Sequence, residues 1–334
     1  MATLEDIARQ LGVSKSTVSK ALNGARDVSS AMRQAVLEKA VELGYTRLQR
    51  GAQASKFALF ITSNIEYGQP DDFGYDMVEG VRKAAEPAGF LVDLIPLTVP
   101  LQEEIHYDTF MIRENYCGGV FFGLSIQQDP WMKEFENCKT PTVLFDNHIS
   151  TNPHVACIGT DNQEGMELVV QYLKGMGHRK IGYLSYELHS YIYLQRYYAF
   201  SQAMRENGLE LPPEQTGTAP HISECLSQYL PKLLKSGCTA IVCSHDLLAH
   251  SVMVHCQELG LRIPTDVSIL GFDDIPLCRY TIPPLTTVRQ DRTNLGRSAV
   301  YALTSLINNV CVSSLLLHAR LIERGSCAQA RKTN

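Results

Sequence analysis

The chain has 334 residues, of which 45% are hydrophobic and 19% charged, and its net charge is −5. At roughly 150 residues per domain, this length predicts about two domains, and the composition excludes a disordered or collagen-like chain. No apolar run reaches the roughly 18 residues of a membrane helix, and the first residues show no secretory signal pattern. We therefore expect a cytoplasmic protein whose ten cysteines stay reduced; none of them forms a Cys-x-x-Cys pair.

The charge is unevenly distributed along the chain. Residues 1–55 carry eight Lys or Arg and five Asp or Glu, a balance of +3, so the remainder carries −5 − 3 = −8. A small basic head on an acidic body predicts that the head binds a polyanion, although a merely solvated basic surface would give the same count.

The first 45 residues predict three short helices. Thr3, Ser14 and Ser29 are each placed to cap a helix, and Asp6 stands at the capping-box position after Thr3. Gly12 supplies the residue that ends the first helix. Two helices joined by a short turn containing Gly and braced by a third are typical of a helix-turn-helix, although an ordinary small helical subdomain shares this pattern.

The predicted second helix presents hydroxyls and cations and no acidic residue. Such side chains suit the major groove of DNA, where Lys contacts guanine or phosphate and Ser or Thr contacts bases and backbone. The candidate DNA-binding residues of this helix are Lys15, Ser16, Thr17, Ser19 and Lys20.

The body alternates strand-like and helix-like segments. Predicted strands cover residues 57–62, 90–96, 119–122, 142–145, 180–185, 240–244 and 267–272. Predicted helices cover residues 75–88, 165–176, 196–207 and 247–259. Two such cycles predict an α/β body of two doubly wound lobes with parallel sheets. Ligands of these folds bind at the carboxyl ends of the strands, so the cleft between the lobes is the expected site.

Signatures of enzymes are missing from the sequence. There is no dinucleotide-binding glycine motif, Walker loop, nucleophile elbow or His-Glu-x-x-His. His245, His250 and His255 are spaced five apart and do not share a helical face, so we expect no metal, no cofactor and no enzyme activity. A transport-type sugar-binding protein and a sugar-modifying enzyme are the alternatives that share a two-lobed body.

The chain resembles the LacI/GalR (lac repressor) family of bacterial transcription regulators. In the head the resemblance lies in residues 3–24, with Val28-Ser29, Arg33 and Glu42-Leu43-Gly44-Tyr45. In the body it lies in residues 159–165, 177–181, 271–274, 282–288 and 321–326, and in Arg196 with Phe200. It implies a DNA-binding domain at 1–45, a shortened hinge at 46–56, a periplasmic-binding-protein-like effector and dimerisation domain at 57–327, and a polar tail at 328–334.

The resemblance also assigns roles in DNA binding. Lys15, Ser16 and Lys20 hold the base-reading positions, while Thr17, Ser19 and Asn23 hold phosphate or turn positions. Lys20 stands where the family usually has Arg, and the hinge lacks the family's Pro and its Leu wedge, with only Leu48 as a substitute. We therefore expect little hinge helix and less DNA bending than in the family.

Candidate effector-binding residues follow the predicted strands or open a helix. By resemblance they are Asp146, Arg196, which we expect to open a helix, His245, where the family often has Asn, and Asp273. Phe73, in the loop after the first strand, is a further stacking candidate. Four tyrosines are candidates either for sugar stacking or for the core, and two Asp residues are expected to be structural. These are Tyr186, Tyr191, Tyr193 and Tyr197, and Asp161 and Asp274.

These observations predict a homodimeric, ligand-responsive regulator of transcription. We expect a repressor of a sugar or related catabolic operon that binds a palindromic operator and a small-molecule effector, and does not bind a membrane. The sequence leaves open the effector's identity, the choice between inducer and corepressor, the operator and its genes, and tetramerisation.

Overall fold

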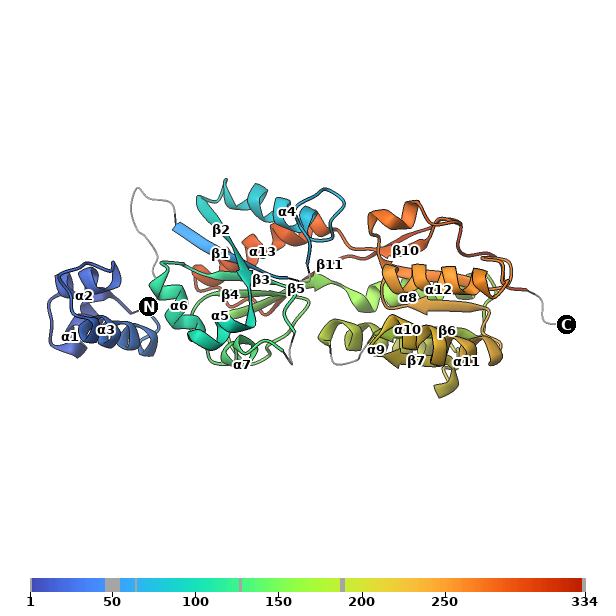
Figure 1. Ribbon diagram of the computed structural model, residues 1–334, viewed down its shortest axis with the longest axis horizontal. Helices are drawn as coiled ribbons and strands as arrows, with labels where there is room; N and C mark the ends of the chain where they lie inside the picture. The colour runs from blue at the N-terminus through green and yellow to red at the C-terminus, as the bar shows by residue number, and fades with distance from the viewer. Residues whose placement is uncertain (1, 46–54, 64, 126–127, 187–189, 332–334) are drawn as a thin grey trace. The chain divides into compact units, whose positions relative to one another are not determined.

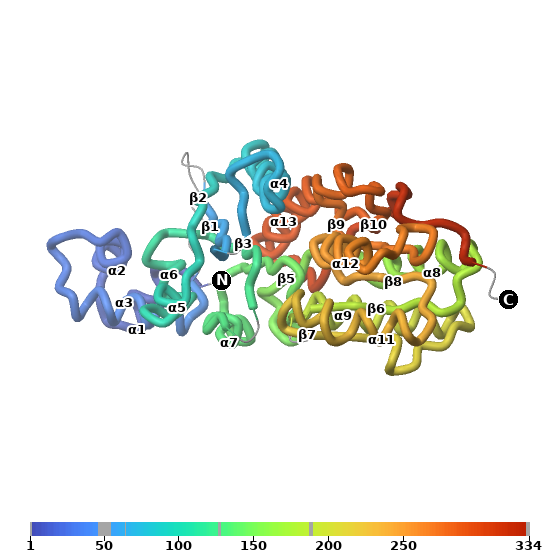
Figure 2. Tube along the Cα trace, turned by 45° about the vertical axis from the view of Figure 1, so that its right-hand side comes forward, coloured from blue at the N-terminus to red at the C-terminus, as the bar shows by residue number. Residues whose placement is uncertain are grey.

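The structure is a computed structural model that describes residues 2–45, 55–63, 65–125, 128–186 and 190–331. It divides the chain into two compact units (Figures 1 and 2). The first comprises residues 1–159 and 292–315, and the second comprises residues 160–291 and 316–334. Among the described residues, no helix is both long and apolar enough to cross a membrane.

The head, at the blue end of the chain in Figure 1, consists of the three predicted helices. They are α1 (Leu4–Leu11), α2 (Lys15–Leu22) and α3 (Ser30–Glu42). Thr3 and Asp6 form a reciprocal capping box, and Ser14 and Ser29 cap the next two helices. Gly12 ends α1 with φ 65°, a conformation that favours glycine. Ile7, Val18 and Val36, one from each helix, are fully buried together, so the expected capping and packing are confirmed.

The body of the first unit is built on a six-stranded sheet in the order β11-β5-β4-β3-β1-β2. The strands are β1 (Ser55–Thr62), β2 (Phe90–Leu97), β3 (Gly119–Phe122), β4 (Thr142–Phe145), β5 (Val155–Thr160) and β11 (Ser314–Leu317). The helices are α4 (Tyr75–Ala85), α5 (Val99–Glu104), α6 (Tyr107–Arg113), α7 (Trp131–Glu134) and α13 (Arg292–Ile307). The pairs among β1 to β5 are parallel, as the alternating pattern predicts.

Helices α4 and α13 pack closely, and each places a glycine against the backbone of the other helix. A β-carbon at Gly80 would lie 2.1 Å from the carbonyl oxygen of Thr293, and one at Gly296 would lie 2.0 Å from that of Met77. Real side chains never approach backbone this closely, so the two helix backbones lie in direct contact. This crossing joins the segment after β1 to a helix more than 200 residues later in the sequence.

The second unit has its own six-stranded sheet in the order β12-β10-β9-β8-β6-β7. The strands are β6 (Ile181–Tyr186), β7 (Thr216–Ala219), β8 (Ala240–Cys243), β9 (Ser268–Asp273), β10 (Thr286–Arg289) and β12 (Arg320–Ile322). The helices are α8 (Asn162–Gly175), α9 (Tyr191–Glu206), α10 (Ile222–Glu224), α11 (Leu230–Lys235) and α12 (Asp246–Glu258), with the shorter turns η1 (Pro213–Gln215), η2 (Cys225–Tyr229) and η3 (Pro276–Arg279). Only the edge strand β12 pairs antiparallel among the described pairs of this sheet.

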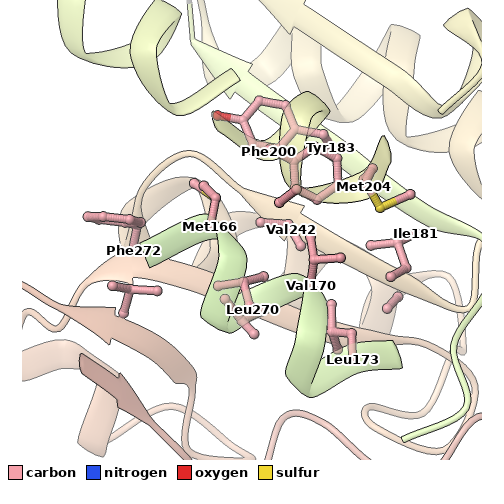
Figure 3. Packing of buried hydrophobic residues seen from close by; sticks show 14 of the residues in the cluster. Met166, Val170, Leu173, Ile181, Tyr183, Phe200, Met204, Val242, Leu270 and Phe272 are labelled. Atoms are coloured by element: carbon pink, nitrogen blue, oxygen red, sulfur yellow. The ribbon is translucent and has the colours of Figure 1, made fainter. Parts of the chain in front are cut away.

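Both faces of the second sheet are covered. On one face, α8 and α9 contribute Met166, Val170 and Phe200 to a cluster with Tyr183 of β6, whose ring lies 4.9 Å from that of Phe200 (Figure 3). On the other face, side chains from α11, α12 and η2 pack against alternate residues of β8 and β9. A sheet buried on both faces explains the continuous apolar runs of its strands.

The prediction of two successive α/β cycles needs one correction. After the second unit has been largely completed, α13 returns to the first unit and β11 joins its sheet, so neither unit is one continuous stretch. Periodicity does not specify which sheet a later element joins.

Several boundaries also shift. The first strand begins at Ser55, two residues before its predicted start, and β5, β7, β10, β11 and β12 were not predicted. The tail begins in contact with the second unit, since the amide of Ala330 donates to the carbonyl of Met176 at 2.8 Å. The predicted hinge features, Leu48 among them, lie outside the described residues.

Candidate DNA-binding surface and effector site

Helix α2 presents most of the predicted DNA-binding residues to solvent. Lys15, Ser16, Lys20 and Asn23 are exposed, whereas Thr17 and Ser19 are half-buried. The Thr17 amide donates to Ser14 Oγ at 3.0 Å, and Asn23 Nδ2 donates to the Ser19 carbonyl at 2.8 Å. Thr17 and Asn23 thus also serve the two ends of α2, and Lys15, Ser16 and Lys20 form its outward face.

Both lysines of this face are paired with acids from flanking segments. Lys15 Nζ lies 2.7 Å from Glu5 Oε1 of α1, and Lys20 Nζ lies 2.5 Å from Asp27 Oδ2 in the connection to α3. The prediction of an acid-free surface holds for α2 itself but misses these partners. The spacing of residues within one helix does not reveal an ion pair between that helix and another segment.

In the second unit, Arg196 is buried in the middle of α9 rather than at the start of a helix, which corrects its predicted position. Its Nη2 donates to Asp273 Oδ1 at 2.9 Å and its Nη1 to the Ser244 carbonyl at 2.6 Å. Its Nε donates to Asn162 Oδ1 at 3.2 Å, and the guanidinium lies 3.8 Å from the centre of the Phe272 ring. Arg196 therefore joins the ends of β8 and β9 to the start of α8.

Asp273 ends β9 in a backbone conformation that side chains rarely adopt, with φ 113°. Its Oδ1 also accepts from Gln290 Nε2 at 2.6 Å, and Gln290 Oε1 accepts from Thr160 Oγ1 at 3.0 Å. Strained backbone held by surrounding contacts is common at ligand sites. The resemblance pointed to Asp273 and Arg196, whereas Thr160 and Asn162 lie inside a stretch of the resemblance that implied no role for them, and Gln290 lies outside every such stretch.

His245 follows β8 and caps α12. Its Nδ1 accepts from the Leu248 amide at 3.2 Å, so in the neutral ring the hydrogen is on Nε2. Burial lowers the pKa of His245 to about 4, which keeps the ring neutral at pH 7. Within the described part of the chain, the buried Nε2 has no hydrogen-bond partner. His245 is thus a helix cap that also offers one unused donor.

The tyrosine group divides between the core and the surroundings of His245, so the core interpretation holds for Tyr197, while sugar stacking stays a prediction. The rings of Tyr186 and Tyr193 stack with centres 5.8 Å apart, and the His245 ring lies 5.0 Å from Tyr186 and 5.7 Å from Tyr193. Tyr197 instead lies against Tyr183 and the buried cluster of Figure 3. Tyr191 is half-buried at the start of α9.

Asp161 and Asp274 are structural, as expected. Asp161 caps α8 by accepting from the Glu164 amide at 3.0 Å. Asp274 accepts from Arg289 Nε and from Arg324 Nη2, both at 2.6 Å, and these two cations hold its pKa below the usual value despite burial.

Asp246, which the sequence reasoning did not select, is buried directly after His245. It accepts from Thr287 Oγ1 at 2.6 Å and from the Ile275 amide at 3.0 Å. Burial, with a contribution from the charge of Asp273, raises its pKa to about 7. Its burial and its raised pKa set it apart from Asp146 and Asp273, and neither property is visible in the sequence.

The remaining two effector candidates belong to the first unit. Asp146 follows β4 with φ 51°, and its amide donates to the Ile158 carbonyl at 3.0 Å. Phe73 is half-buried with the Arg292 guanidinium 5.5 Å from its ring centre. The structure thus brings Arg196, His245 and Asp273 together at one edge of the second sheet, and places the other two candidates in the other unit.

The described residues contain no candidate metal centre. No group of three or more His, Cys, Asp or Glu side chains there could hold a metal ion. All ten cysteines are free thiols, and only Cys311 among them is exposed.

Two protein-family models match this chain, one in the head and one in the body. Residues 3–47 match the model described as "Bacterial regulatory proteins, lacI family", and residues 170–327 match a periplasmic binding protein-like domain. The regulator MalR of Streptomyces coelicolor is 30% identical over 346 residues, covering 98% of this chain and 97% of MalR. The chain belongs to the lacI family.

Other relatives agree with this assignment. The transcriptional repressor CytR of Escherichia coli is 29% identical over 333 residues, 97% of this chain and 96% of CytR. A lac repressor dimer bound to operator and an anti-inducer matches 98% of this chain and 99% of its own with a TM-score of 0.65 and 25% identity. The structure of a CelR–cellobiose complex matches over 98% of this chain and 100% of its own length, with a TM-score of 0.70 and 24% identity. As a member of the lacI family, the chain is a ligand-responsive, DNA-binding regulator of transcription.

Proposed function

We propose that the chain represses a sugar or related catabolic operon by binding a palindromic operator, with Lys15, Ser16 and Lys20 reading bases. The observation that carries this proposal is the outward face of α2, which presents two cations and a hydroxyl from a fully capped three-helix head. Lys donates to the guanine acceptors of the major groove, and Ser contacts bases or phosphate. Thr17, Ser19 and Asn23 act beside them at the backbone or in holding α2 in place.

Dimerisation is needed because one small head makes few contacts. Specific sites are bound at about 10⁻⁸ M or tighter, which two heads on two half-sites can reach. Two-fold symmetry of the dimer then requires a symmetric operator, with half-sites about one helical turn or a small multiple apart.

For the dimer contact we propose the outer face of α12 and the loop after η3. Leu247 and Val254, two turns apart on α12, are 53% and 41% exposed, and Tyr280 and Ile282 of the loop are 78% and 83% exposed. Gln257 Nε2 donates to the Ile282 carbonyl at 2.6 Å and holds the loop against α12. Exposed apolar side chains gathered on one surface are typical of protein contacts.

For the effector we propose the edge of the second sheet where Arg196, His245 and Asp273 meet. The unused Nε2–H of His245 can donate to a ligand oxygen, and the rings of Tyr186 and Tyr193 offer an apolar face. Hydroxyls on a compact ring match this combination of a polar donor and a flat apolar surface. Cellobiose and ribose, the ligands named with two solved relatives, are sugars of this kind. Asp146 and Phe73 remain candidates for further effector contacts.

We further propose that the chain regulates without catalysing a reaction, because the relatives are named as regulators and repressors rather than as enzymes. Turnover of a sugar that binds the chain would contradict this.

Two measurements test the proposed function. Selection of duplexes from a random pool by the full-length chain should enrich a symmetric sequence, and footprinting should show two equal protected half-sites. A thermal-shift screen of sugars, nucleosides and sugar phosphates should yield a compound that raises the melting temperature and changes operator affinity, by about 5- to 150-fold at the usual size of allosteric coupling. Enrichment of no sequence, or a ligand without effect on DNA binding, would overturn the proposal.

A further inference from the structure

Both lysines on the outward face of α2 form ion pairs within the head. Each ammonium contacts a carboxylate from another segment of the head, Lys15 with Glu5 at 2.7 Å and Lys20 with Asp27 at 2.5 Å. All four side chains remain more than half exposed, between 53% and 64%. The pairs therefore lie at the surface that the proposed function brings to DNA.

Both carboxylates are ionised at neutral pH. The hydrogen bond from Lys15 lowers the pKa of Glu5, and the hydrogen bond from Lys20 lowers that of Asp27. An ionised carboxylate beside the DNA backbone repels phosphate, so these acids oppose any mode of binding in which phosphate approaches them.

An ammonium has three N–H donors and can serve a carboxylate and a base acceptor together. On operator DNA, each lysine can thus donate to a base edge while its acid holds it in place. On other DNA the attraction is to phosphate alone. Because the carboxylate repels phosphate, a lysine that contacts phosphate either brings the two negative groups together or leaves its acid unpaired. The ion pairs therefore weaken binding to non-operator DNA more than binding to operator DNA.

We propose that Glu5 and Asp27 are positioning residues that set the discrimination between operator and non-operator DNA by holding Lys15 and Lys20. This inference rests on the proposed role of α2 in base reading. The acids act through the lysines and need not touch DNA themselves.

The test compares the full-length wild type with the double variant Glu5→Gln/Asp27→Asn. One probe is the duplex selected from the random pool, and the other is the same duplex with both half-sites scrambled. An exposed ion pair changes binding by roughly 2-fold, so the loss of all four pairs of a dimer should give the scrambled duplex about 16-fold tighter binding. Operator affinity should change by less than about threefold, so that the ratio of the two affinities falls.

Salt dependence gives a second readout. The slope of log K against log salt for the scrambled duplex should steepen by about 1 for each lysine released to contact phosphate. In a Lys20→Gln background, Asp27→Asn should no longer change the affinity ratio.

The matched control is Glu38→Gln/Glu42→Gln. Both glutamates are exposed on α3, and neither contacts Lys15 or Lys20. Like the test variant, it changes the charge of residues 1–55 from +3 to +5. Equal effects in both variants would show that net charge alone matters and would overturn the inference, as would an unchanged affinity ratio in the test variant.

Two further outcomes are distinguishable. If the wild type selects no duplex, the proposed function fails and this inference fails with it. In the second outcome, the wild type discriminates between the two duplexes while Glu5→Gln lowers the melting temperature of the head. The affinity ratio of the single variant Asp27→Asn then tests the inference, because Asp27 lies outside the three helices.

Discussion

Arg196 Nη2 lies 2.9 Å from Asp273 Oδ1, and the two side chains are only 3% and 14% exposed. The pair joins the middle of α9 to the end of β9, residues 77 positions apart. A buried ion pair contributes modestly as a whole, but removing one partner leaves the other charge uncompensated. The residues proposed to meet the effector are therefore also part of what holds the second unit together.

The first prediction follows from this pair. Asp273→Ala should lower the free energy of unfolding by about 3 kcal/mol even without effector, because the buried Arg196 guanidinium loses the opposite charge of Asp273 at 2.9 Å. Urea unfolding followed by circular dichroism measures the change. The control Glu114→Ala breaks an exposed pair with Arg113, and should change stability by less than about 1 kcal/mol. Equal small losses in both variants would show that the buried pair is not structural.

The second prediction concerns pH. The pKa of His245 is about 4 in the folded chain and 6.5 ordinarily, so below pH 6.5 the unfolded chain binds a proton that the folded chain does not. Stability should therefore fall as the pH drops from 6.5 to 4, by up to roughly 3 kcal/mol from this residue.

His245→Asn tests this effect while keeping a side chain that caps helices well. The difference in unfolding free energy between the variant and wild type should change across pH 4 to 6.5 and stay flat above it. Comparison with wild type cancels the opposite trend from Asp246, whose raised pKa makes stability fall as the pH rises from about 4 to about 7. Parallel pH profiles would contradict the buried neutral state of His245.

The third prediction concerns the crossing of α4 and α13. Gly→Ala inside a helix ordinarily stabilises by up to about 1 kcal/mol. At Gly80 and Gly296 the sign should reverse, because the new methyl group would overlap the facing carbonyl and force the helices apart, with a loss of about 1–3 kcal/mol. Gly175→Ala in α8 is the control, since nothing lies within 4 Å of its added carbon. Thermal melting should separate the two glycines from the control, and three similar shifts would refute the close crossing.

The fourth prediction separates structure from DNA reading within the head. Ser14→Ala removes the cap of α2 and should lower the stability of the head by about 1 kcal/mol. Ser16→Ala should leave that stability unchanged while altering base preference at one position of each half-site. Melting curves together with binding to singly substituted operators check both outcomes. A large loss of stability in Ser16→Ala would remove it from the reading surface.

Local features of the fold could be predicted because the chemistry of a few neighbouring residues decides them. Thr3, Ser14 and Ser29 mark where helices begin, and buried strands such as β3 and β4 appear as short apolar runs. Strand β10 was missed because it reads Thr-Thr-Val-Arg, with polar side chains that are satisfied only once the sheet has formed.

Relations between distant segments could not be predicted. Arg196 with Asp273, and Lys15 with Glu5, are pairs whose members lie on separate elements, so no local period reveals them. The resemblance to known regulators supplied Arg196 and Asp273 as candidates, but it did not indicate that each holds the other. The contacts that Asn162 and Gln290 make with this pair could not be predicted for the same reason.

The division of the chain has a consequence for engineering. The chain passes between the two units three times, near residues 159, 291 and 315. A fragment ending at residue 159 would lack α13 and would expose the glycine-lined face of α4 that this helix covers. A chimera that gives this head a new effector response should therefore be joined at a single point between residues 46 and 54, with everything from β1 onward taken from one donor. Grafting either unit alone would need three matched junctions, and an error at any of them would leave a hydrophobic surface open to aggregation.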